Sequence, residues 1–288
     1  MHEIESKTIL SAKNGMNLYR GCTHGCIYCD SRSDCYRMDH LFEDIAVKRN
    51  APALLEDALR RKRRPCMIGT GSMCDPYMHC EEALGYTRRC LEIIDKYSCG
   101  VTVITKSDRI LRDIDLFERI NRHSKAVAQI TLTTYEEELC RIIEPKVCTT
   151  KRRYEVLKEF QKRGIPTVVW LCPILPYIND TEENLRGILD YCFDAGVVGI
   201  LNFGFGVTLR GGSREYFYQK LDEHFPGMKD RYQKRFGDSY ECPSENAAKL
   251  WNIFQRECQA NGVMWSPKEI FGFLNEYPKT HEQLSLFD

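Results

Sequence analysis

Short apolar runs alternate with amphipathic stretches along most of the chain. Five runs rich in β-branched residues are bounded by Gly, Pro or Ser, namely residues 65–71, 100–107, 126–134, 165–175 and 197–205. Runs of this length and composition are typical of buried parallel strands. We expect a further strand just before Cys22. The apolar pattern therefore predicts six strands.

Helical patterns separate these strands. Apolar residues recur at helical spacing, and Pro, Thr and Gly mark several of the ends. The expected helices cover residues 52–63, 81–97, 113–123, 151–164 and 181–196. Strands that alternate with helices predict a parallel sheet with right-handed crossovers. The predicted fold class is therefore α/β, a partial (β/α)6 barrel of TIM type.

The pattern changes after about residue 211. Two aromatic-rich helical stretches follow, residues 213–236 and 244–262, and we expect no strand between them. We divide the chain accordingly into three parts. These are a partial barrel (residues 1–210), a helical C-terminal extension packed on the barrel (211–277) and a tail (278–288).

Composition limits where the protein works. Hydrophobic residues make up 43% and charged residues 28% of the chain, and no window approaches the roughly 18 apolar residues of a membrane helix. The N-terminal residues lack the apolar core of a secretory signal. The 15 cysteines are scattered through expected helices and strands, which is typical of free thiols in a reducing compartment. We expect a soluble cytoplasmic protein with no membrane partner.

One short segment carries candidate chemistry. The sequence NLYRGCTHGCIYC places Cys22, Cys26 and Cys29 in a CxxxCxxC pattern behind the first strand. Three thiolates can hold three irons of a [4Fe-4S] cluster and leave the fourth open, whereas structural zinc normally has four protein ligands. Two alternatives stay open. One is a zinc site completed by His24 or Cys35, and the other is three unrelated core thiols.

This motif, with Tyr28 before its third cysteine, resembles the signature of the radical S-adenosylmethionine (SAM) superfamily. The resemblance implies that the open iron binds the amino and carboxylate groups of SAM. It also implies that the reduced cluster cleaves SAM to methionine and a 5′-deoxyadenosyl radical, which abstracts a hydrogen atom from substrate. The implied partners include an electron donor such as flavodoxin or ferredoxin. The protein would orient the cofactor and exclude solvent.

The same resemblance implies a set of SAM contacts. The segment GTGS at residues 69–72 follows the second strand, where relatives carry a Gly-rich segment near the SAM amino group. Alone, such a segment is also typical of a tight turn, and Lys or Thr at a strand end is commonly solvated or hydrogen-bonded. The implied SAM-binding residues are Tyr28, Gly69, Gly71, Ser72, Lys106, Thr131 and Thr133.

Further segments sharpen the resemblance over about residues 14–205. TGSMCDPYMHCE, TKSDRILRDIDL, IEP and PILPYINDTEEN are together similar to the spore photoproduct lyase-like (DNA repair photolyase-like) branch. In that lyase a cysteine beyond the second strand returns a hydrogen atom to the product radical. Cys74, beside Tyr77, takes the comparable place, so both are candidate catalytic residues, although a buried structural thiol is the alternative for Cys74. Asp30 replaces the tyrosine that follows the third cluster cysteine there.

Signals for nucleic acid are local, because Lys+Arg and Asp+Glu both number 41. The five cations of residues 60–64 complement the C-terminal end of a helix dipole. The aromatic and basic residues within 214–236 could stack bases and neutralise phosphates, or could instead combine core packing with surface charge. The tail offers a separate signal. Its pentapeptide Gln283, Leu284, Ser285, Leu286 and Phe287 is similar to the peptide with which bacterial repair proteins dock on the DNA sliding clamp.

Taken together, these features predict a radical SAM enzyme that abstracts hydrogen from nucleic acid, at a DNA lesion or a modified base. One alternative is a radical SAM enzyme acting on a peptide, a protein or a small metabolite. An alternative of another class is a non-catalytic metal-binding adaptor that docks on the sliding clamp.

Overall fold

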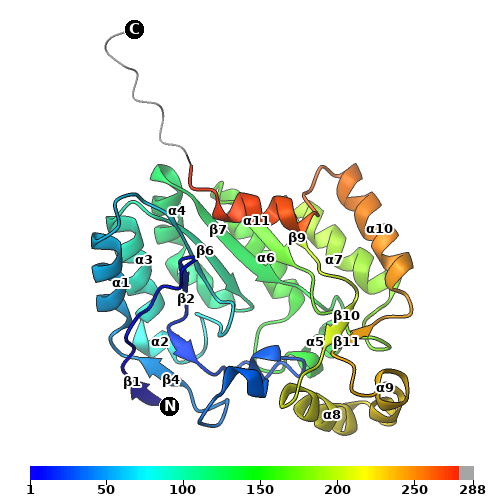
Figure 1. Ribbon diagram of the computed structural model, residues 1–288. Coiled ribbons are helices and arrows are strands. Elements are labelled where there is room, and N and C mark those ends of the chain that lie inside the picture. The colour runs from blue at the N-terminus through cyan, green and yellow to red at the C-terminus, as the bar shows by residue number, and fades with distance from the viewer. Residues whose placement is uncertain (279–288) are drawn as a thin grey trace.

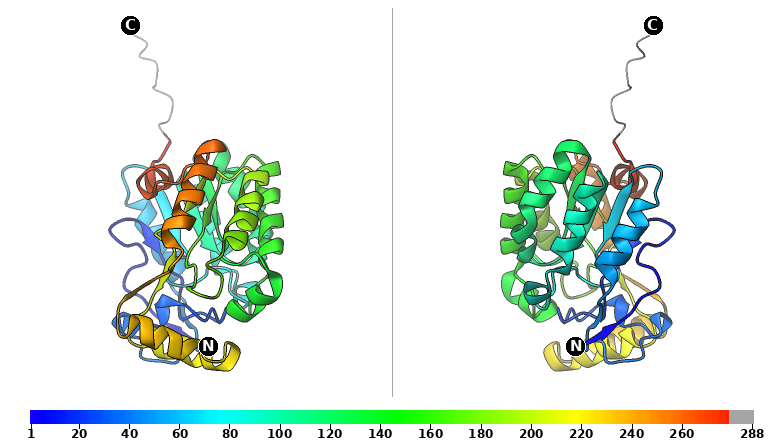
Figure 2. Two further views of the ribbon diagram at one scale, coloured as in Figure 1. Left: turned by 90° about the vertical axis from the view of Figure 1, so that its right-hand side faces the viewer. Right: turned by 90° about the vertical axis from the view of Figure 1, so that its left-hand side faces the viewer.

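The computed structural model describes residues 1–278, and the expected order of strands and helices in the barrel is confirmed there (Figure 1). The main sheet is parallel and its strand order follows the chain, β2-β5-β6-β7-β8-β9. Its strands are β2 (Gly15–Met16), β5 (Met67–Thr70), β6 (Gly100–Thr105), β7 (Ala126–Thr131), β8 (Thr167–Trp170) and β9 (Gly199–Leu201). Helices cover the outer face of this curved sheet, as expected for a partial barrel (Figure 2).

The covering helices match the predicted segments closely. They are α1 (Ala51–Arg60), α3 (Tyr86–Lys96), α4 (Ile114–His123), α6 (Thr150–Lys162) and α7 (Glu182–Asp194). The stretch predicted as one helix over residues 81–97 forms two, because Gly85 adopts a left-handed φ of 62° between α2 (Glu81–Leu84) and α3. The sequence analysis missed the short helix α5 (Glu137–Ile143).

The barrel core lies between the sheet and these helices. All six residues of β7 are buried, in keeping with a central strand that helices and neighbouring strands enclose. Phe117 of α4 and Phe160 of α6 are fully buried and meet edge to face, with ring centroids 5.3 Å apart. Burial of one such side chain stabilises a fold by roughly 1.5–3 kcal/mol.

A small second sheet holds the N-terminal segment, which the sequence analysis did not predict. Its order is β1-β4-β3, formed by β1 (His2–Ile4), β4 (Ala46–Lys48) and β3 (Tyr19–Arg20). The chain leaves the barrel after β2, pairs antiparallel with β4 through β3, and reaches Cys22 two residues later. The cysteine motif is therefore anchored on both the barrel and this sheet.

The C-terminal extension is mainly helical, but the expectation that it contains no strand was wrong. Its helices are α8 (Ser213–His224), α9 (Met228–Phe236), α10 (Ala247–Ala260) and α11 (Pro267–Asn275). Between α9 and α10 the strand β11 (Glu241–Pro243) pairs antiparallel with β10 (Gly206–Thr208). This pairing links distant segments, so no local pattern announces it.

The extension packs against the cysteine loop. Phe217 of α8 and Tyr232 of α9 belong to the same buried apolar cluster as Ile27 and Tyr28. Helix α11 instead packs against the sheet, where Ile270 contacts residues of β7, β8 and β9. The expected clamp-binding pentapeptide, residues 283–287, lies outside the described residues. No helix within residues 1–278 is long and apolar enough to cross a membrane.

Candidate functional site

Two adjoining cavities lie where the strands of the main sheet reach their carboxyl ends. The smaller, of about 100 Å³, is lined by the three cysteines of the motif and by residues that follow β5 and β6. The larger, of about 710 Å³, extends from there toward β8, β9 and the β10–β11 pair. Residues that line both are Tyr28, Cys29, Ser31, Ser72 and Lys106. A ligand in one cavity can therefore reach a ligand in the other.

The cysteine loop suits a [4Fe-4S] cluster. Cys22, Cys26 and Cys29 all line the smaller cavity, and none forms a disulfide. Cys35 is exposed, and its sulfur accepts a hydrogen bond from Arg210 at 3.4 Å. It does not line the smaller cavity, so it is not placed as a fourth ligand. Three thiols around one cavity are the donor set that leaves one iron of such a cluster open.

His24 also lines this cavity. Its Nδ1 lies 3.4 Å from Asp75 Oδ2, while its buried Nε2 has no hydrogen-bond partner. Burial lowers the pKa of the imidazole to about 4, although the Asp75 carboxylate acts in the opposite direction. The ring is therefore neutral near pH 7.

A buried ion pair packs against the cysteine loop and holds it in place. Glu144 and Arg153 are almost fully buried, and Arg153 Nη2 lies 2.5 Å from Glu144 Oε2. The other carboxylate oxygen of Glu144 accepts a hydrogen bond from the Tyr28 hydroxyl. Arg153 also donates to the backbone carbonyls of Thr131 and Cys148, each at 2.9 Å. The pair therefore joins the end of β7, helix α6 and the cysteine loop.

Backbone hydrogen bonds complete this attachment. Ile27 N–H donates to the carbonyl of Ile143 at 3.0 Å, and Lys146 N–H donates to the carbonyl of His24 at 3.1 Å. The loop is thus paired with the residues on both sides of Glu144. Its geometry depends on the segment 143–146 as much as on its own cysteines.

The charge state of Glu144 follows from its partners. Burial alone would raise the pKa of this carboxyl, but the charges of Arg153 and Lys106 outweigh burial and hold the pKa below its ordinary value. Its contribution to stability is therefore complete above the ordinary glutamate pKa, about 4.3. That contribution is lost as the pH falls through the lower value of the folded state.

Several of the residues expected to bind SAM meet at the smaller cavity. Gly71 has a φ of 99°, and a Cβ there would lie 2.1 Å from the carbonyl oxygen of Ile104. Only glycine fits this close approach of two strand ends. Gly71 and Ser72 line the smaller cavity, and Lys106 and Tyr28 line both, with the ammonium 5.8 Å from the tyrosine ring centroid.

Three other expected SAM contacts line neither cavity. Gly69 lies within β5, paired with Gly15 on one side and Thr102 on the other. The carbonyl of Thr131 accepts the hydrogen bond from Arg153, and the carbonyl of Thr133 accepts from two asparagine side chains. The two threonines act here as hydrogen-bond partners at the end of β7.

Only one of the two expected catalytic residues lines a cavity. Cys74 lines the smaller cavity, and its thiol, only 5% exposed, donates to the carbonyl of Tyr19 at 3.1 Å. Burial raises the pKa of this thiol to about 12, so it stays protonated near pH 7. Tyr77 is fully buried, and its hydroxyl donates to Asp113 at 3.1 Å. Tyr77 lines neither cavity.

Sequence reasoning missed Asp75, which links two strand ends. Its Oδ1 accepts from the Thr105 hydroxyl at 2.7 Å and from Tyr77 N–H at 2.9 Å. Its Oδ2 accepts from Lys106 N–H at 2.8 Å. The available signal was an acidic residue in the loop that follows β5. No sequence signal pointed to Arg153, because a cationic residue in an amphipathic helix usually lies on the solvated face.

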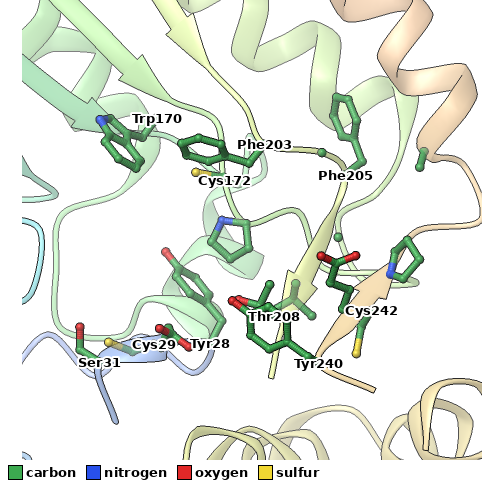
Figure 3. A pocket seen from close by; sticks show the side chains of 18 of the residues that line it. Tyr28, Cys29, Ser31, Trp170, Cys172, Phe203, Phe205, Thr208, Tyr240 and Cys242 are labelled. Carbon is green, nitrogen blue, oxygen red and sulfur yellow. The ribbon is translucent and has the colours of Figure 1, made fainter. Parts of the chain in front are cut away.

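The walls of the larger cavity come from several parts of the chain. Figure 3 shows Tyr28 and Cys29 on one side, and Trp170, Cys172 and Phe203 at another end. Residues of the β10–β11 pair, among them Thr208 and Cys242, form a third side. The extension thus contributes to the site and does not merely cover it.

Comparison with known families agrees with this geometry. The family model described as "Radical SAM superfamily" matches residues 16–192, which include the cysteine loop and strands β3 to β8. The chain belongs to the radical SAM superfamily. Members of this superfamily are enzymes that use a [4Fe-4S] cluster and SAM, so these are the cofactors of this radical SAM protein. Cys22, Cys26 and Cys29 fit the cluster-binding role.

Similar proteins span most of this radical SAM protein. An uncharacterized protein of Mycobacterium tuberculosis is 25% identical over 244 residues, covering 82% of this chain and 71% of the relative. An uncharacterized protein of Methanocaldococcus jannaschii is 32% identical over 181 residues, 62% of this chain and 67% of the relative. A spore photoproduct lyase variant, solved with AdoMet and dinucleoside spore photoproduct, has a TM-score of 0.63 at 13% identity, covering 86% of this chain and 74% of that one. The similarity to the spore photoproduct lyase variant shows a shared fold alone.

The first prediction concerns the buried ion pair. Glu144→Gln leaves Arg153 buried without its counter-charge, and breaking such a pair typically costs about 3–5 kcal/mol. We expect lower stability in urea and less iron bound per folded chain after anaerobic reconstitution. Unfolding curves together with iron and sulfide analysis measure both quantities.

Asp113→Asn is the matched control, because this fully buried carboxylate pairs with Arg88 and Arg112 outside both cavities. It should lower stability while the folded protein still incorporates iron. Full iron content and unchanged stability in Glu144→Gln would show that the pair does not support the loop.

Proposed function

We propose that this radical SAM enzyme abstracts a hydrogen atom from nucleic acid, at a damaged or modified base. The observation that carries the proposal is the larger cavity, which begins at Cys29 and Tyr28 of the cluster loop and is walled by aromatic side chains. Its volume of about 710 Å³ lies within the range of small-molecule sites, roughly 300–1,000 Å³. A single nucleotide withdrawn from its neighbours is a ligand of suitable size and shape.

The chain's own residues have distinct tasks in this proposal. The three cysteines hold the cluster, and Gly71, Ser72, Lys106 and Tyr28 contact SAM. When bound, SAM and the reduced cluster supply the hydrogen-abstracting chemistry. Helices α8 and α9 pack around the loop and keep water from this side of the cavity. Gly69, Thr131 and Thr133 act by supporting the strand ends.

Similarity to spore photoproduct lyase supports the choice of nucleic acid. That lyase shares the fold over 86% of this chain and was solved with a dinucleoside photoproduct bound. Asp30 lines the larger cavity here, where the lyase-like pattern has a tyrosine. We therefore extend the proposal to damaged or modified bases in general and not to that photoproduct alone.

Cys74 is proposed as the hydrogen donor that completes the reaction. Its protonated thiol would give a hydrogen atom to the carbon radical of the product, which forms a C–H bond and leaves a sulfur radical. One electron from the electron donor that reduces the cluster, together with a proton from solvent, would restore the thiol, so that 5′-deoxyadenosine is released as a product. Tyr77 would contribute through the packing of the segment that carries Cys74, because its hydroxyl faces Asp113.

The proposal is tested by offering candidate substrates to the reconstituted enzyme. Reduced protein and SAM are incubated with ultraviolet-irradiated DNA, unmodified DNA, RNA or a mixed peptide, and 5′-deoxyadenosine is quantified over time. We expect a nucleic acid to accelerate its release above the rate without substrate. Acceleration by the peptide alone would contradict the proposal and favour an enzyme acting on proteins.

The second prediction separates cluster ligands from other thiols. Replacing Cys22, Cys26 or Cys29 by Ala should remove the brown chromophore and SAM cleavage, because each thiolate holds one iron. Cys35→Ala serves as the control and should retain both. If Cys35→Ala empties the site instead, the three-ligand assignment is wrong.

The third prediction addresses Cys74. Cys74→Ala should leave SAM cleavage running while the products shift toward adducts, because the product radical lacks its hydrogen donor. Cys90→Ala is the control, since this fully buried thiol of α3 lines neither cavity. Each loss should cost on the order of 1 kcal/mol of stability. An unchanged product distribution, measured by mass spectrometry, would remove Cys74 from the reaction.

A further inference from the structure

Exposed aromatic side chains gather at the mouth of the larger cavity. The large hydrophobic residues exposed within residues 1–278 are Met1, Leu41, Tyr135, Phe203, Tyr240 and Phe271. Phe203 (59% exposed) and Tyr240 (44%) line the cavity, and Phe271 (38%) packs beside Phe203. Half of this set therefore lies at one opening. Large exposed apolar groups that cluster in this way mark a binding surface.

Three rings form a continuous aromatic platform, defined here as Trp170, Phe203 and Phe271. The rings of Phe203 and Phe271 have centroids 6.2 Å apart and planes inclined by 27°. The Trp170 ring lies 5.9 Å from that of Phe203 and 6.5 Å from that of Phe271. Figure 3 shows Trp170 and Phe203 next to each other, at a different end of the cavity from Cys29.

The platform is held by the core of the barrel. Trp170 ends β8, and its Nε1–H donates to Gln129 Oε1 of β7 at 2.8 Å. The amide of Gln129 in turn donates to the hydroxyl of Thr102 on β6. Phe271 belongs to α11, which packs on β9. Trp170 and Phe271 are thus presented from a strand and a helix, whereas Phe203 lies in the bend between β9 and β10. Phe203 and Phe271 remain exposed.

The platform continues beyond the cavity. Trp170 and Phe203 line the cavity, whereas Phe271 does not. A small molecule enclosed by the cavity would leave Phe271 without a contact. A ligand that covers all three rings must extend outward from the site, as a polymer does. Flat rings exposed along such a path favour a polymer that carries flat groups of its own.

A cation lies at another side of the same mouth. Arg210 Nη2 donates to the Tyr240 hydroxyl at 2.8 Å, and its guanidinium carbon lies 4.9 Å from the Tyr240 ring centroid. The Arg210 side chain is 39% exposed, and its Nε is 3.5 Å from Asp30. A half-exposed guanidinium beside an exposed aromatic ring suits a phosphate next to a base.

We propose that the aromatic platform stacks the nucleobases that flank the base in the cavity, and that Arg210 contacts the backbone phosphate on the opposite side. This inference rests on the proposed action on nucleic acid and adds that the strand is bound single-stranded. Base faces are free to stack on aromatic rings only where the duplex is opened. Because every base has such a face, the contact tolerates any flanking sequence.

Fluorescence anisotropy of a labelled oligothymidylate of about twelve nucleotides tests the platform. The protein is anaerobically reconstituted and supplied with SAM. Phe203→Ala and Phe271→Ala should each raise the Kd roughly tenfold, the effect of losing one stacked base. Phe203→Leu should bind as weakly as Phe203→Ala, because it restores apolar area without a flat ring, whereas Phe203→Trp should bind like the unaltered protein.

Tyr135→Ala is the matched control, an exposed aromatic residue (39%) that lines neither cavity, and it should bind the probe normally. Thermal unfolding and iron content should match the unaltered protein in every variant. Full binding by Phe203→Ala and Phe271→Ala would overturn the platform and leave the proposed function standing. If the unaltered protein does not bind the probe but binds an aromatic peptide, both the platform and the proposed function fail.

Discussion

The buried pair of Glu144 and Arg153 fixes the loop on which the chemistry depends. Both charged groups are buried away from solvent, and a charge left unpaired at this position would strongly destabilise the folded state. Both side chains instead have further hydrogen-bond partners. Glu144 accepts from the Tyr28 hydroxyl, and Arg153 donates to the carbonyls of Thr131 and Cys148. A loop with three cysteines and two left-handed glycines, Gly21 and Gly25, has little regular structure of its own. Its shape is imposed by this pair and by the backbone of residues 143–146.

The position of the loop determines the rest of the site. Cys26, Ile27 and Tyr28 face the apolar side of α8 and α9, so the extension is held at the mouth of the barrel. This placement brings β10 and β11 to the larger cavity, where they form a further wall. Residues of the barrel and residues of the extension thus line the same cavity. Neither part forms the cavity alone.

Local patterns predicted the barrel because its elements are specified locally. Buried strands such as 126–131 are short runs rich in apolar residues, and the covering helices repeat apolar residues at helical spacing. The strand pairings that were missed join segments far apart in the sequence. β3 pairs with β4, and β10 pairs with β11, with 32 residues between Thr208 and Glu241.

The residues of the site also differ in whether a local sequence pattern could place them. Cysteine spacing is local, and Gly71 and Ser72 follow a strand, so sequence could place them. Arg153 lies in a charged helical stretch that resembles a solvated surface, yet the fold buries it completely. Phe203 and Phe271 are 68 positions apart and become one platform only after α11 packs on β9. Tyr77 follows Cys74 closely in sequence, but its hydroxyl turns to Asp113.

The central proposal is that the cofactors and a nucleic-acid substrate react where the two cavities adjoin. Transfer of deuterium tests it most directly. The reduced, reconstituted enzyme is given SAM and an oligonucleotide whose nucleotides are deuterated, and the mass of the released 5′-deoxyadenosine is measured. The account predicts that 5′-deoxyadenosine gains deuterium from the oligonucleotide. Release of unlabelled 5′-deoxyadenosine with every deuterated oligonucleotide, together with label gained from a deuterated peptide, would contradict it.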